Sequence, residues 1–426
     1  MINKISNALI FNFLPTNRWF GTALACCWPT SLPQWHAPET LLPDNKLTNA
    51  MKIIHLILGK ANPERMNGVN KVVHALATEQ HRAGADVAVW GITADLSENY
   101  PAREFATRLF TARCNPFGLA RTLIEALDEL AEWPGEVVVH LHGAFIPVYH
   151  TLARQLTALG IPYVLTPHGS YSPAALCKSR LTKLAYGYLF ENYLLRHSAR
   201  IHCLGLSEVA GVQHLGKTLR TNLLPYGFEP PQPVEPLVPA AKDRFRVGFC
   251  GRLDDHHKGL NCLLAGFAEF ARYVPKAELW IIGDGPDRKL VADWAAEAPA
   301  GTVKLLGSRF GDEKIALLGQ LDVFAHTSHY EGLPTAVLEA VALGVPCVVT
   351  EATNLGSYVR EYDCGEVLAT ASPVLLTEAL HRLYEQWGTP AAVAIAGRCR
   401  HMVNTAFNWQ HLLPTYHQMY QDALVA

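Results

Sequence analysis

Two glutamates, Glu331 and Glu339, flank the start of a predicted helix and stand eight positions apart. Pro334 suits the first turn of that helix, because the N–H group that proline lacks would have no partner there. The free amides from Gly332 to Thr335 would then form a positive pole that binds anions. A carboxylate on each side of this pole indicates a site for hydroxyl groups on both sides of a phosphate. A surface helix with two solvated glutamates explains the same pattern and stays open.

A second charged group contains Arg252 and Lys258 and lies between a predicted strand and a predicted helix. In α/β folds, loops at the carboxyl ends of the strands bind ligands. Arginine offers a bidentate fork and lysine a point charge, so the pair predicts a diphosphate site. A loop with scattered charges is the alternative. His256 and His257 are adjacent, a spacing that does not suit two ligands of one metal ion, so we expect no zinc site here.

Glycines follow two further predicted strands. Gly283 and Gly285 come after one of them, but Pro286 interrupts the helix that a dinucleotide fingerprint needs. This motif therefore indicates either a close backbone approach to a ligand or a plain turn. Asn67 and Gly68 follow the first predicted strand and precede a helix. A glycine at that position lets backbone amides approach a phosphate.

Two histidines, His142 and His168, each precede a glycine at the predicted end of a strand. A histidine at such a point can act on a ligand, because its ring donates or accepts protons near neutral pH. A structural or capping role is the commoner one. The residues alone leave both roles open for each histidine.

The elements that must position these residues alternate between short apolar runs and amphipathic stretches. In the first half the predicted strands are residues 53–58, 87–90, 137–142, 163–166, 200–204 and 222–225. In the second half they are residues 246–250, 278–282, 303–306, 323–325 and 346–350. Helices are predicted between them, for example over residues 70–82, 119–130, 259–273 and 335–343. Such alternation predicts two parallel sheets with helices on both faces.

A proline-rich stretch, residues 229–241, separates the two halves and predicts an extended linker. We therefore predict a first domain over 51–228, a linker over 229–243, a second domain over 244–405 and a C-terminal helix over 406–426. Residues 1–50 lack useful periodicity and are expected to be an extension outside the fold, with Met51 as the biological start. A loose membrane-associating arm is the alternative for them.

Composition excludes several classes of protein. Of the 426 residues, 49% are hydrophobic and 17% are charged, which is typical of a globular protein. The formal net charge of −2 argues against a nucleic-acid-binding protein. No apolar run reaches the roughly 18 residues of a transmembrane helix. The ten cysteines form no C-x-x-C pair and lie mostly in apolar runs, which indicates buried free thiols in a reducing cytosol.

Taken together, these motifs resemble the retaining glycosyltransferases of family 4, which have the GT-B fold. The resemblance covers about residues 51–424 and rests on Arg252 with Lys258, the motif at 283–286, and Glu331 with Glu339, in that order and spacing. It implies an α/β protein with two Rossmann-like domains that face each other across a cleft. The first domain would bind the acceptor and the second the nucleotide-sugar donor. The C-terminal helix would cross back to the first domain.

The resemblance also implies a role for each motif. The two cations would neutralise the donor diphosphate, Glu339 would hold the ribose hydroxyls, and Glu331 with the amides of Gly332 and Leu333 would contact the transferred sugar. His168 would contact that sugar near the reaction centre. The expected catalytic residues are Glu331, His168, Arg252 and Lys258, and the expected donor-binding residues are Asn67, Gly68, Arg252, Lys258, Gly283, Gly332, Leu333, Pro334, Thr335 and Glu339. Where the family often has two glycines, this chain has Asn67 and Gly68.

The expected chemistry is the stabilisation of negative charge as a diphosphate leaves. Arg252, Lys258 and the helix pole can supply that stabilisation without a metal ion. Asp254 and Asp255 do not form a D-x-D motif, so we expect no obligatory metal and no other cofactor. By the family's chemistry, attack on the same face of the sugar would let the departing phosphate act as the base.

The acceptor is less legible. Between residues 176 and 200, basic residues alternate with aromatic residues and leucines, and Lys178, Arg180 and Lys183 lie close together. One interpretation is peripheral contact with an anionic membrane that carries a lipid-linked sugar. The other is a helix with an apolar core face and solvated lysines.

We therefore expect a cytoplasmic retaining hexosyltransferase, peripheral on the inner face of the plasma membrane. It would use a UDP- or GDP-linked sugar and a glycan or lipid-linked acceptor of a cell-surface polysaccharide or lipopolysaccharide. The alternatives are a nucleotide-sugar epimerase or phosphorylase of the same fold, and an inactive binding module. An NAD-dependent oxidoreductase ranks below them, because neither half has a G-x-G-x-x-G turn.

Overall fold

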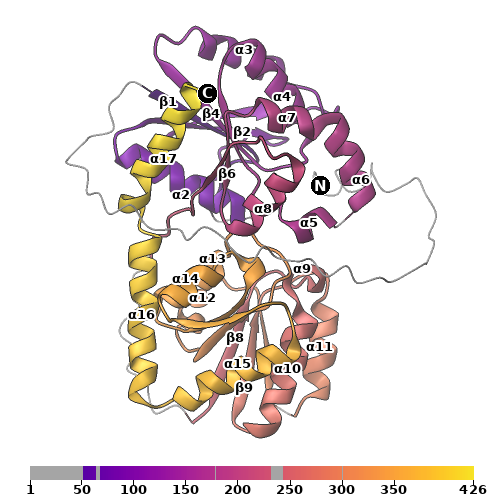
Figure 1. Cartoon of the computed structure of the whole chain (residues 1–426), viewed down its shortest axis with the longest axis vertical. Helices are drawn as coiled ribbons and strands as arrows, with labels where there is room; N and C mark the ends of the chain where they lie inside the picture. The colour runs from indigo at the N-terminus through magenta and orange to yellow at the C-terminus, as the bar shows by residue number, and fades with distance from the viewer. Residues whose placement is uncertain (1–50, 64–67, 178, 232–242, 300) are drawn as a thin grey trace. The chain divides into compact units, whose positions relative to one another are not determined.

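The computed structural model describes residues 51–63, 68–177, 179–231, 243–299 and 301–426. These residues form two parallel sheets, one of seven strands and one of six, each with helices on both faces (Figure 1). Both sheets are therefore of the kind that the alternating pattern predicts. The predicted extension at residues 1–50 and most of the predicted linker, at 232–242, lie outside the described residues.

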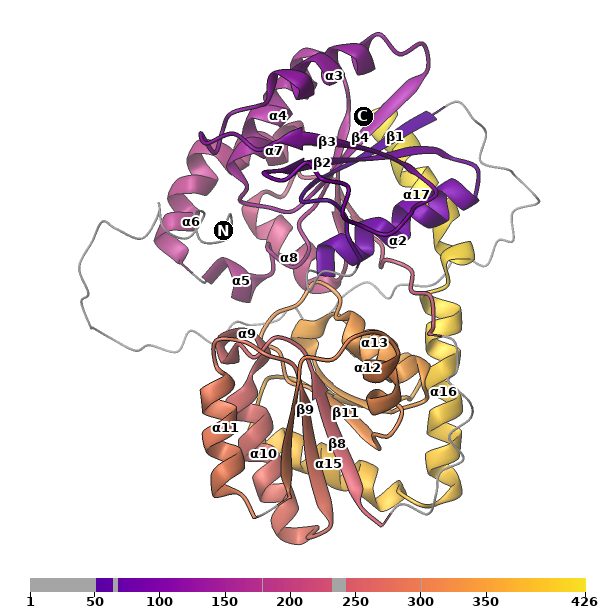
Figure 2. The same ribbon diagram turned by 180° about the vertical axis from the view of Figure 1, so that it is seen from behind.

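The first sheet has the strand order β3-β2-β1-β4-β5-β6-β7. Its strands are β1 (Met51–Leu58), β2 (Asp86–Thr93), β3 (Ala106–Thr111), β4 (Glu136–His142), β5 (Tyr163–Thr166), β6 (Arg200–Cys203) and β7 (Thr221–Leu223). Its helices are α2 (Gly68–Arg82), α3 (Arg121–Ala131), α4 (Pro147–Ala158), α5 (Pro173–Cys177), α6 (Arg180–Tyr186), the π-helix η1 (Gly187–Glu191), α7 (Asn192–His197) and α8 (Leu206–Leu215). Helices α3, α4 and α7 cover one face and α2 lies on the other (Figure 2).

The second sheet has the order β10-β9-β8-β11-β12-β13. Its strands are β8 (Phe245–Cys250), β9 (Ala277–Ile282), β10 (Val303–Gly307), β11 (Val323–His326), β12 (Cys347–Thr350) and β13 (Gly365–Leu368). Its helices are α9 (Asp255–Lys258), α10 (Leu260–Tyr273), α11 (Arg288–Glu297), α12 (Gly311–Leu318), α13 (Thr335–Ala342), the 3-10 helix η2 (Glu351–Thr353), α14 (Gly356–Glu361) and α15 (Pro373–Gln386). Helices α10 and α11 lie on the opposite side of the strands from α12 and α13 (Figure 2).

The chain ends in two helices, α16 (Pro390–Ala406) and α17 (Trp409–Leu424). The prediction of one C-terminal helix from residue 406 is wrong at its start: α16 ends there, and Asn408 caps α17 by accepting a hydrogen bond from the amide of Gln410 at 2.8 Å. Helix α17 packs against α2, β4, β5 and β6, so the end of the chain belongs to the first domain.

Two edge strands, β3 and β13, are absent from the sequence-based prediction. Exposed and half-buried residues dominate both, so neither shows the apolar run of a central strand. The cysteine prediction is partly wrong, because Cys114 and Cys177 are exposed, while the other six described cysteines are free and buried. Among the described helices none is both long and apolar enough to cross a membrane.

Candidate active site

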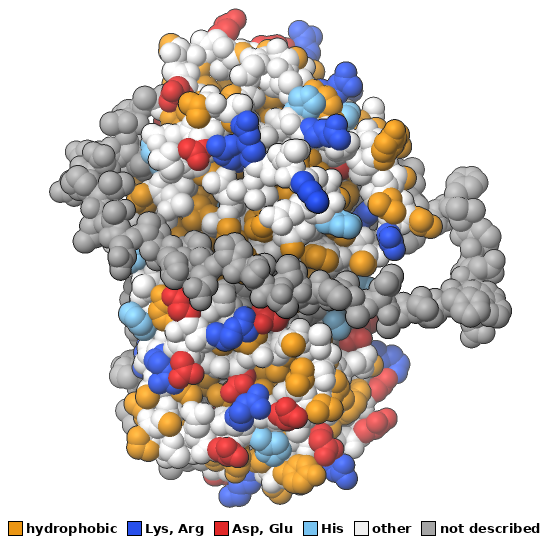
Figure 3. Space-filling view, in the orientation of Figure 1, with side chains coloured by type: hydrophobic (Ala, Val, Ile, Leu, Met, Phe, Trp, Pro, Cys, Tyr) orange, Lys and Arg blue, Asp and Glu red, His pale blue; other side chains and the backbone are white. Residues whose placement is uncertain are grey.

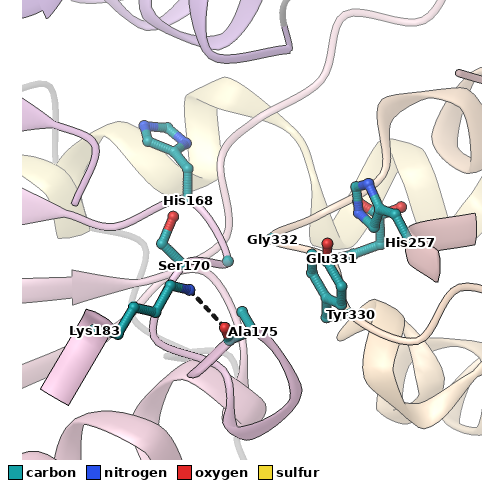
Figure 4. Close-up of a pocket in the computed structure, with 9 residues that line it drawn as sticks. His168, Ser170, Ala175, Lys183, His257, Tyr330, Glu331 and Gly332 are labelled. Carbon is teal, nitrogen blue, oxygen red and sulfur yellow. Dashed lines mark hydrogen bonds and ion pairs between the residues drawn. The ribbon is translucent and has the colours of Figure 1, made fainter. Parts of the chain in front are cut away.

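A pocket of about 170 Å³ lies between the two domains (Figure 4). The first domain lines it with His168, Gly169, Ser170, Ala175 and Lys183, and the second with His257, Tyr330, Glu331 and Gly332. Pockets that enclose a drug-sized ligand have volumes of about 300–1,000 Å³, so this one accepts only part of a nucleotide sugar. The structure thus brings together three predicted site residues from both halves of the chain.

Glu331 is buried in this pocket, with its carboxylate held by side chains of its own domain. Its Oε1 atom accepts hydrogen bonds from His326 Nε2 and Ser328 Oγ, both at 3.0 Å, and from Lys258 Nζ. Burial alone would raise the pKa of Glu331, but the charge of Lys258 and hydrogen bonds from His257 and His326 bring it well below its usual value. Glu331 is therefore an ionised carboxylate that already has a cationic partner.

The two sides of the pocket touch at Gly169 and Gly332. A Cβ atom on Gly169 would lie 2.6 Å from the amide nitrogen of Gly332, and the φ angle of Gly169 is +87°. Only glycine fits such an approach without displacing the backbone. The amide of Gly169 donates to the buried carboxylate of Glu208, which also accepts from the amide of Leu204 at 2.8 Å. Burial raises the pKa of Glu208 to about 7.

Asn354 joins the two domains beside the pocket. Its Nδ2 donates to the carbonyl oxygens of Glu331, at 2.9 Å, and Gly332, at 2.8 Å. Its Oδ1 accepts from the amide of Ser207 in the first domain at 3.1 Å. Sequence reasoning missed Asn354 and Glu208, because neither lies in a recognisable motif.

Arg252 and Gly283 lie at the carboxyl ends of β8 and β9. Arg252 is exposed, and its side chain has no hydrogen bond or ion pair with any residue in the described part of the chain. Gly283 has a φ of +146°, and a Cβ atom there would lie 1.9 Å from the carbonyl oxygen of Gly251. Packing between two loops of the domain therefore accounts for this glycine. Its role in donor binding stays a prediction.

Glu339 lies on α13 and pairs with Lys314 of α12 at 2.6 Å. Lys71, from the first turn of α2, lies close to this pair. Burial lowers the pKa of Lys71, the charge of Lys314 lowers it further, and Glu339 partly counters both effects. The predicted ribose-binding carboxylate thus pairs with one lysine and has a second nearby, and sequence reasoning singled out neither.

The pole of α13 differs slightly from the prediction. Pro334 is the N-cap, just before the first turn, and Thr335 is the first helical residue. The amides of Gly332, Leu333 and Thr335 donate to no other residue in the described part of the chain. Leu333 is buried, and its carbonyl accepts a hydrogen bond from the Tyr226 hydroxyl. Free amides beside Glu331 leave this pole available to an anion.

The predicted glycine-rich loop is only partly described. Gly68 is the first residue of α2, is exposed, and has open space around the position of a Cβ atom. Asn67 lies outside the described residues. No steric reason thus requires the glycine at position 68, and its contact with a phosphate stays a prediction.

His168 lies in the turn after β5, with a φ of 52°. Its Nε2 atom is 3.1 Å from Nδ1 of His142, which extends from the end of β4. Burial, and then the charge of His202, lowers the pKa of His168 to about 3. The imidazole is therefore neutral at physiological pH and cannot serve there as a general acid.

The structure places Arg180 and Lys183 of the predicted basic surface in different environments. Arg180 is exposed, but Lys183 turns inward, donates to the carbonyl of Ala175 at 2.5 Å and lines the pocket, so its predicted membrane contact is corrected (Figure 4). Lys178 lies outside the described residues. Leu181 and Tyr188 are 83% and 81% exposed, which contradicts the alternative of an apolar core face. Hydrophobic and basic side chains gather at the edge where α6 lies (Figure 3).

Comparison with protein families matches both halves of the chain. Residues 67–227 match the glycosyl transferase 4-like domain, and residues 237–400 match the glycosyl transferases group 1. The mycobacterial glycogen synthase (Mycobacterium tuberculosis) is 28% identical over 192 residues, which are 43% of this chain and 45% of that protein. The chain thus aligns with less than half of the length of that relative.

Two other relatives align over more of their length. The putative glycosyltransferase EpsF of Bacillus subtilis is 26% identical over 78% of this chain and 90% of that protein. A UDP-Gal:alpha-D-GlcNAc-diphosphoundecaprenol alpha-1,3-galactosyltransferase of Escherichia coli is 25% identical over 68% of this chain and 76% of its own length.

Solved structures share the fold. The sucrose-phosphate synthase of Thermosynechococcus elongatus has a TM-score of 0.66 at 20% identity and covers 88% of this chain and 99% of its own. The Anabaena protein HepE in complex with UDP and glucose has a TM-score of 0.64 at 18% identity, over 87% of this chain and 99% of that one. The two parallel sheets are thus those of the GT-B fold.

Proposed function

We propose, because this chain belongs to the group 1 glycosyltransferases with a 4-like first domain, that it transfers a hexose from a nucleoside-diphosphate sugar with retention of configuration. The observation that carries the proposal is the pocket that joins ionised Glu331, neutral His168 and the free amide of Gly332. A small polar pocket with both hydrogen-bond acceptors and donors suits a sugar. The adjoining pole of α13 suits the phosphate to which that sugar is attached.

The pocket supports a reaction in which the leaving phosphate takes the acceptor proton. A general base works best when its pKa is near the working pH. The two titratable groups that face each other here are poor bases, because the pKa of Glu331 lies well below its usual value and that of His168 is about 3. Attack on the same face as the leaving group needs no third residue. We accordingly assign Glu331 to charge stabilisation at the sugar rather than to proton removal.

We propose that the reaction needs no metal ion. Arg252, Lys258 and the amides at the start of α13 would balance the charge of the diphosphate. Turnover of the purified protein should be unchanged in excess EDTA. A loss of turnover that Mg²⁺ or Mn²⁺ restores would refute this part of the proposal.

We propose that the donor is a UDP- or GDP-sugar, with UDP favoured by the complex of the HepE relative. Thermal shifts of the full chain with UDP, GDP, ADP and NAD would test the choice, since a ligand at 100 times its Kd stabilises by about 2.7 kcal/mol. A shift with one nucleoside diphosphate should disappear in Glu339→Ala. It should persist in Glu313→Ala, which removes an exposed glutamate of α12. A shift with NAD alone would refute the proposal.

We propose that the acceptor is a lipid-linked glycan of a surface polysaccharide or lipopolysaccharide, reached at the cytoplasmic face of the plasma membrane. The support is the exposed apolar surface of α6 and η1, with Arg180 beside it, and the lipid-linked acceptor named for the E. coli relative. Flotation with anionic vesicles should fall for a double variant, Leu181→Ser with Tyr188→Ser. It should not fall for Val393→Ser, which changes a 74% exposed residue on α16. Equal flotation of the two variants would contradict the membrane contact.

A further inference from the structure

A continuous chain of hydrogen bonds runs through the interior of the first domain, from His168 at the pocket to helix α17. All of its histidines except His168 are at most 3% exposed. Its links are His168 Nε2 to His142 Nδ1 (3.1 Å), His142 Nε2 to His55 Nδ1 (2.9 Å), His55 Nε2 to Gln80 Oε1 (2.6 Å), Gln80 Nε2 to the Tyr420 hydroxyl (3.2 Å), that hydroxyl to His140 Nδ1 (2.9 Å), His140 Nε2 to Thr166 Oγ1 (2.6 Å), Thr166 Oγ1 to His202 Nδ1 (2.7 Å) and His202 Nε2 to Leu224 O (2.7 Å).

The end of the hydrogen-bond chain at Leu224 determines which atoms donate and which accept along it. The carbonyl of Leu224 can only accept, so Nε2 of His202 must carry a proton. A neutral His202 then has a bare Nδ1, which accepts from the Thr166 hydroxyl. Thr166 has given its one proton away and must accept from Nε2–H of His140. The Nδ1 atom of His140 is therefore an acceptor.

Tyr420 passes this donor-to-acceptor direction on to the part of the hydrogen-bond chain that leads to His168. Its hydroxyl has a single proton, which goes to Nδ1 of His140. The Gln80 amide nitrogen must consequently donate to the tyrosine oxygen, so the amide oxygen faces His55 and accepts from its Nε2–H. The orientation of Gln80 thus follows from the tyrosine proton.

The last two links pass the direction on to the pocket. Nδ1 of His55 accepts from Nε2–H of His142, and Nδ1 of His142 accepts from Nε2–H of His168. The scheme requires neutral histidines, and burial lowers the pKa of both His55 and His202 to about 4. Only Nδ1 of His168 is left without a partner among the described residues, and it carries a lone pair.

We infer that Tyr420, a positioning residue on the C-terminal helix, holds His168 in the tautomer that offers an unprotonated Nδ1 to the pocket. This inference deepens the proposed function and rests on it for the identity of the ligand: a donor-sugar hydroxyl would donate to this nitrogen. The tautomer of a histidine is set by what its other nitrogen binds. Here that partner is His142, which Tyr420 orients through Gln80 and His55. Helix α17 thereby contributes to the pocket without touching it.

Three of these histidines, His55, His140 and His142, have ring nitrogens within 4.8 Å of one another, as in a metal site. Every ring nitrogen of the three already has a hydrogen-bond partner. The 2.9 Å between His55 Nδ1 and His142 Nε2 is also shorter than the about 3.3 Å that separates two ligands of a tetrahedral zinc ion. The hydrogen-bond chain therefore accounts for the cluster without an ion.

The test is ¹⁵N NMR of histidine-labelled full-length protein, which reports the tautomer of each ring. We expect the Nε2–H tautomer at His168, with its signal assigned by its loss in His168→Gln. Tyr420→Phe frees the Gln80 amide to turn over, so His168 should shift to a mixture or to the Nδ1–H form. Tyr416→Phe removes another buried hydroxyl of α17, which donates to the carbonyl of Pro225 and lies 3.5 Å from His202 Nε2. Because that nitrogen keeps its 2.7 Å bond to Leu224, the tautomer should stay unchanged.

Activity gives a second readout. Loss of one hydrogen bond to the sugar should lower kcat/KM about tenfold in Tyr420→Phe and leave Tyr416→Phe unchanged. If Tyr420→Phe does not fold, Thr166→Val interrupts the same chain between His140 and His202. An unchanged His168 tautomer in folded Tyr420→Phe or Thr166→Val, or a stoichiometric metal ion in the purified protein, would overturn the inference. Because the NMR experiment needs no donor, its result is independent of whether the proposed function holds.

Discussion

The buried histidines predict that the first domain loses stability as the pH falls below about 6.5. His55, His140, His142 and His202 are at most 3% exposed, and burial lowers the pKa of each, to about 4 for His55 and His202. A group whose pKa is lower in the folded state takes up its proton on unfolding. Its contribution to stability is therefore complete above pH 6.5 and is lost as the pH falls toward 4.

The magnitude follows from the number of protons. Each such histidine loses about 1.4 kcal/mol for each pH unit below 6.5. These four and His168, whose pKa is lowered to about 3, together lose about 7 kcal/mol between pH 7.5 and 5.5. Glu208 acts in the opposite sense, because its pKa is raised to about 7 and its native protonated form gains stability over the same interval. That gain is about 2 kcal/mol, which leaves a net loss of about 5 kcal/mol. Domains of ordinary stability have only about 5–15 kcal/mol in total.

Urea unfolding of the full chain at pH 7.5 and 5.5, followed by circular dichroism, measures this difference. His55→Gln removes one titrating group and should reduce the loss by about 1.4 kcal/mol. His214→Gln, which changes an exposed histidine of α8, should not alter it. Equal stability at the two pH values, or the same pH dependence in His55→Gln as in the unmodified protein, would refute the reasoning.

Three further predictions concern the pocket. Gly169→Ala should lower the melting temperature, because its Cβ atom would meet the amide nitrogen of Gly332 at 2.6 Å, while Gly397→Ala, with open space around it, should not. Asn354→Ala should cost about 1–3 kcal/mol in urea unfolding, because it removes hydrogen bonds that join the two domains. Glu331→Gln keeps the shape of the side chain but removes its charge, and should lower kcat by about 10²-fold or more in a transfer assay.

The central parts of the fold were predictable from the sequence. Strands such as β5 and β9 are fully buried and consist mainly of apolar residues, which locates the loops that follow them. The predicted residues at the carboxyl ends of β8 and β5 and at the start of α13 lie where the strand pattern places them. Edge strands were missed because β3 is largely exposed and half its residues are polar, so it contains no apolar run of a central strand.

The contacts between residues far apart in the sequence could not be predicted in the same way. His55 and His140 are single polar residues inside apolar strands, and nothing in their sequence neighbourhood shows that they lie in one chain with Tyr420. Glu208 lies in a helix of ordinary appearance. Its carboxylate accepts a hydrogen bond from the amide of Gly169, which is 39 residues away in the sequence. Such pairings follow from strand order and helix packing, which motif spacing does not contain.

The pair between Lys258 and Glu331 constrains how the two cations share the donor. A buried carboxylate that loses its lysine partner costs about 3–5 kcal/mol, so we expect Lys258 to stay with Glu331 when a phosphate binds. Lys258 would contact a phosphate of the donor while it stays paired with Glu331. It would thus connect the leaving group to the sugar site. Arg252 has no ion pair to break among the described residues and is exposed. Under the proposed function, Arg252 would therefore be the cation that supplies binding energy, while Lys258 would set the relative position of diphosphate and sugar.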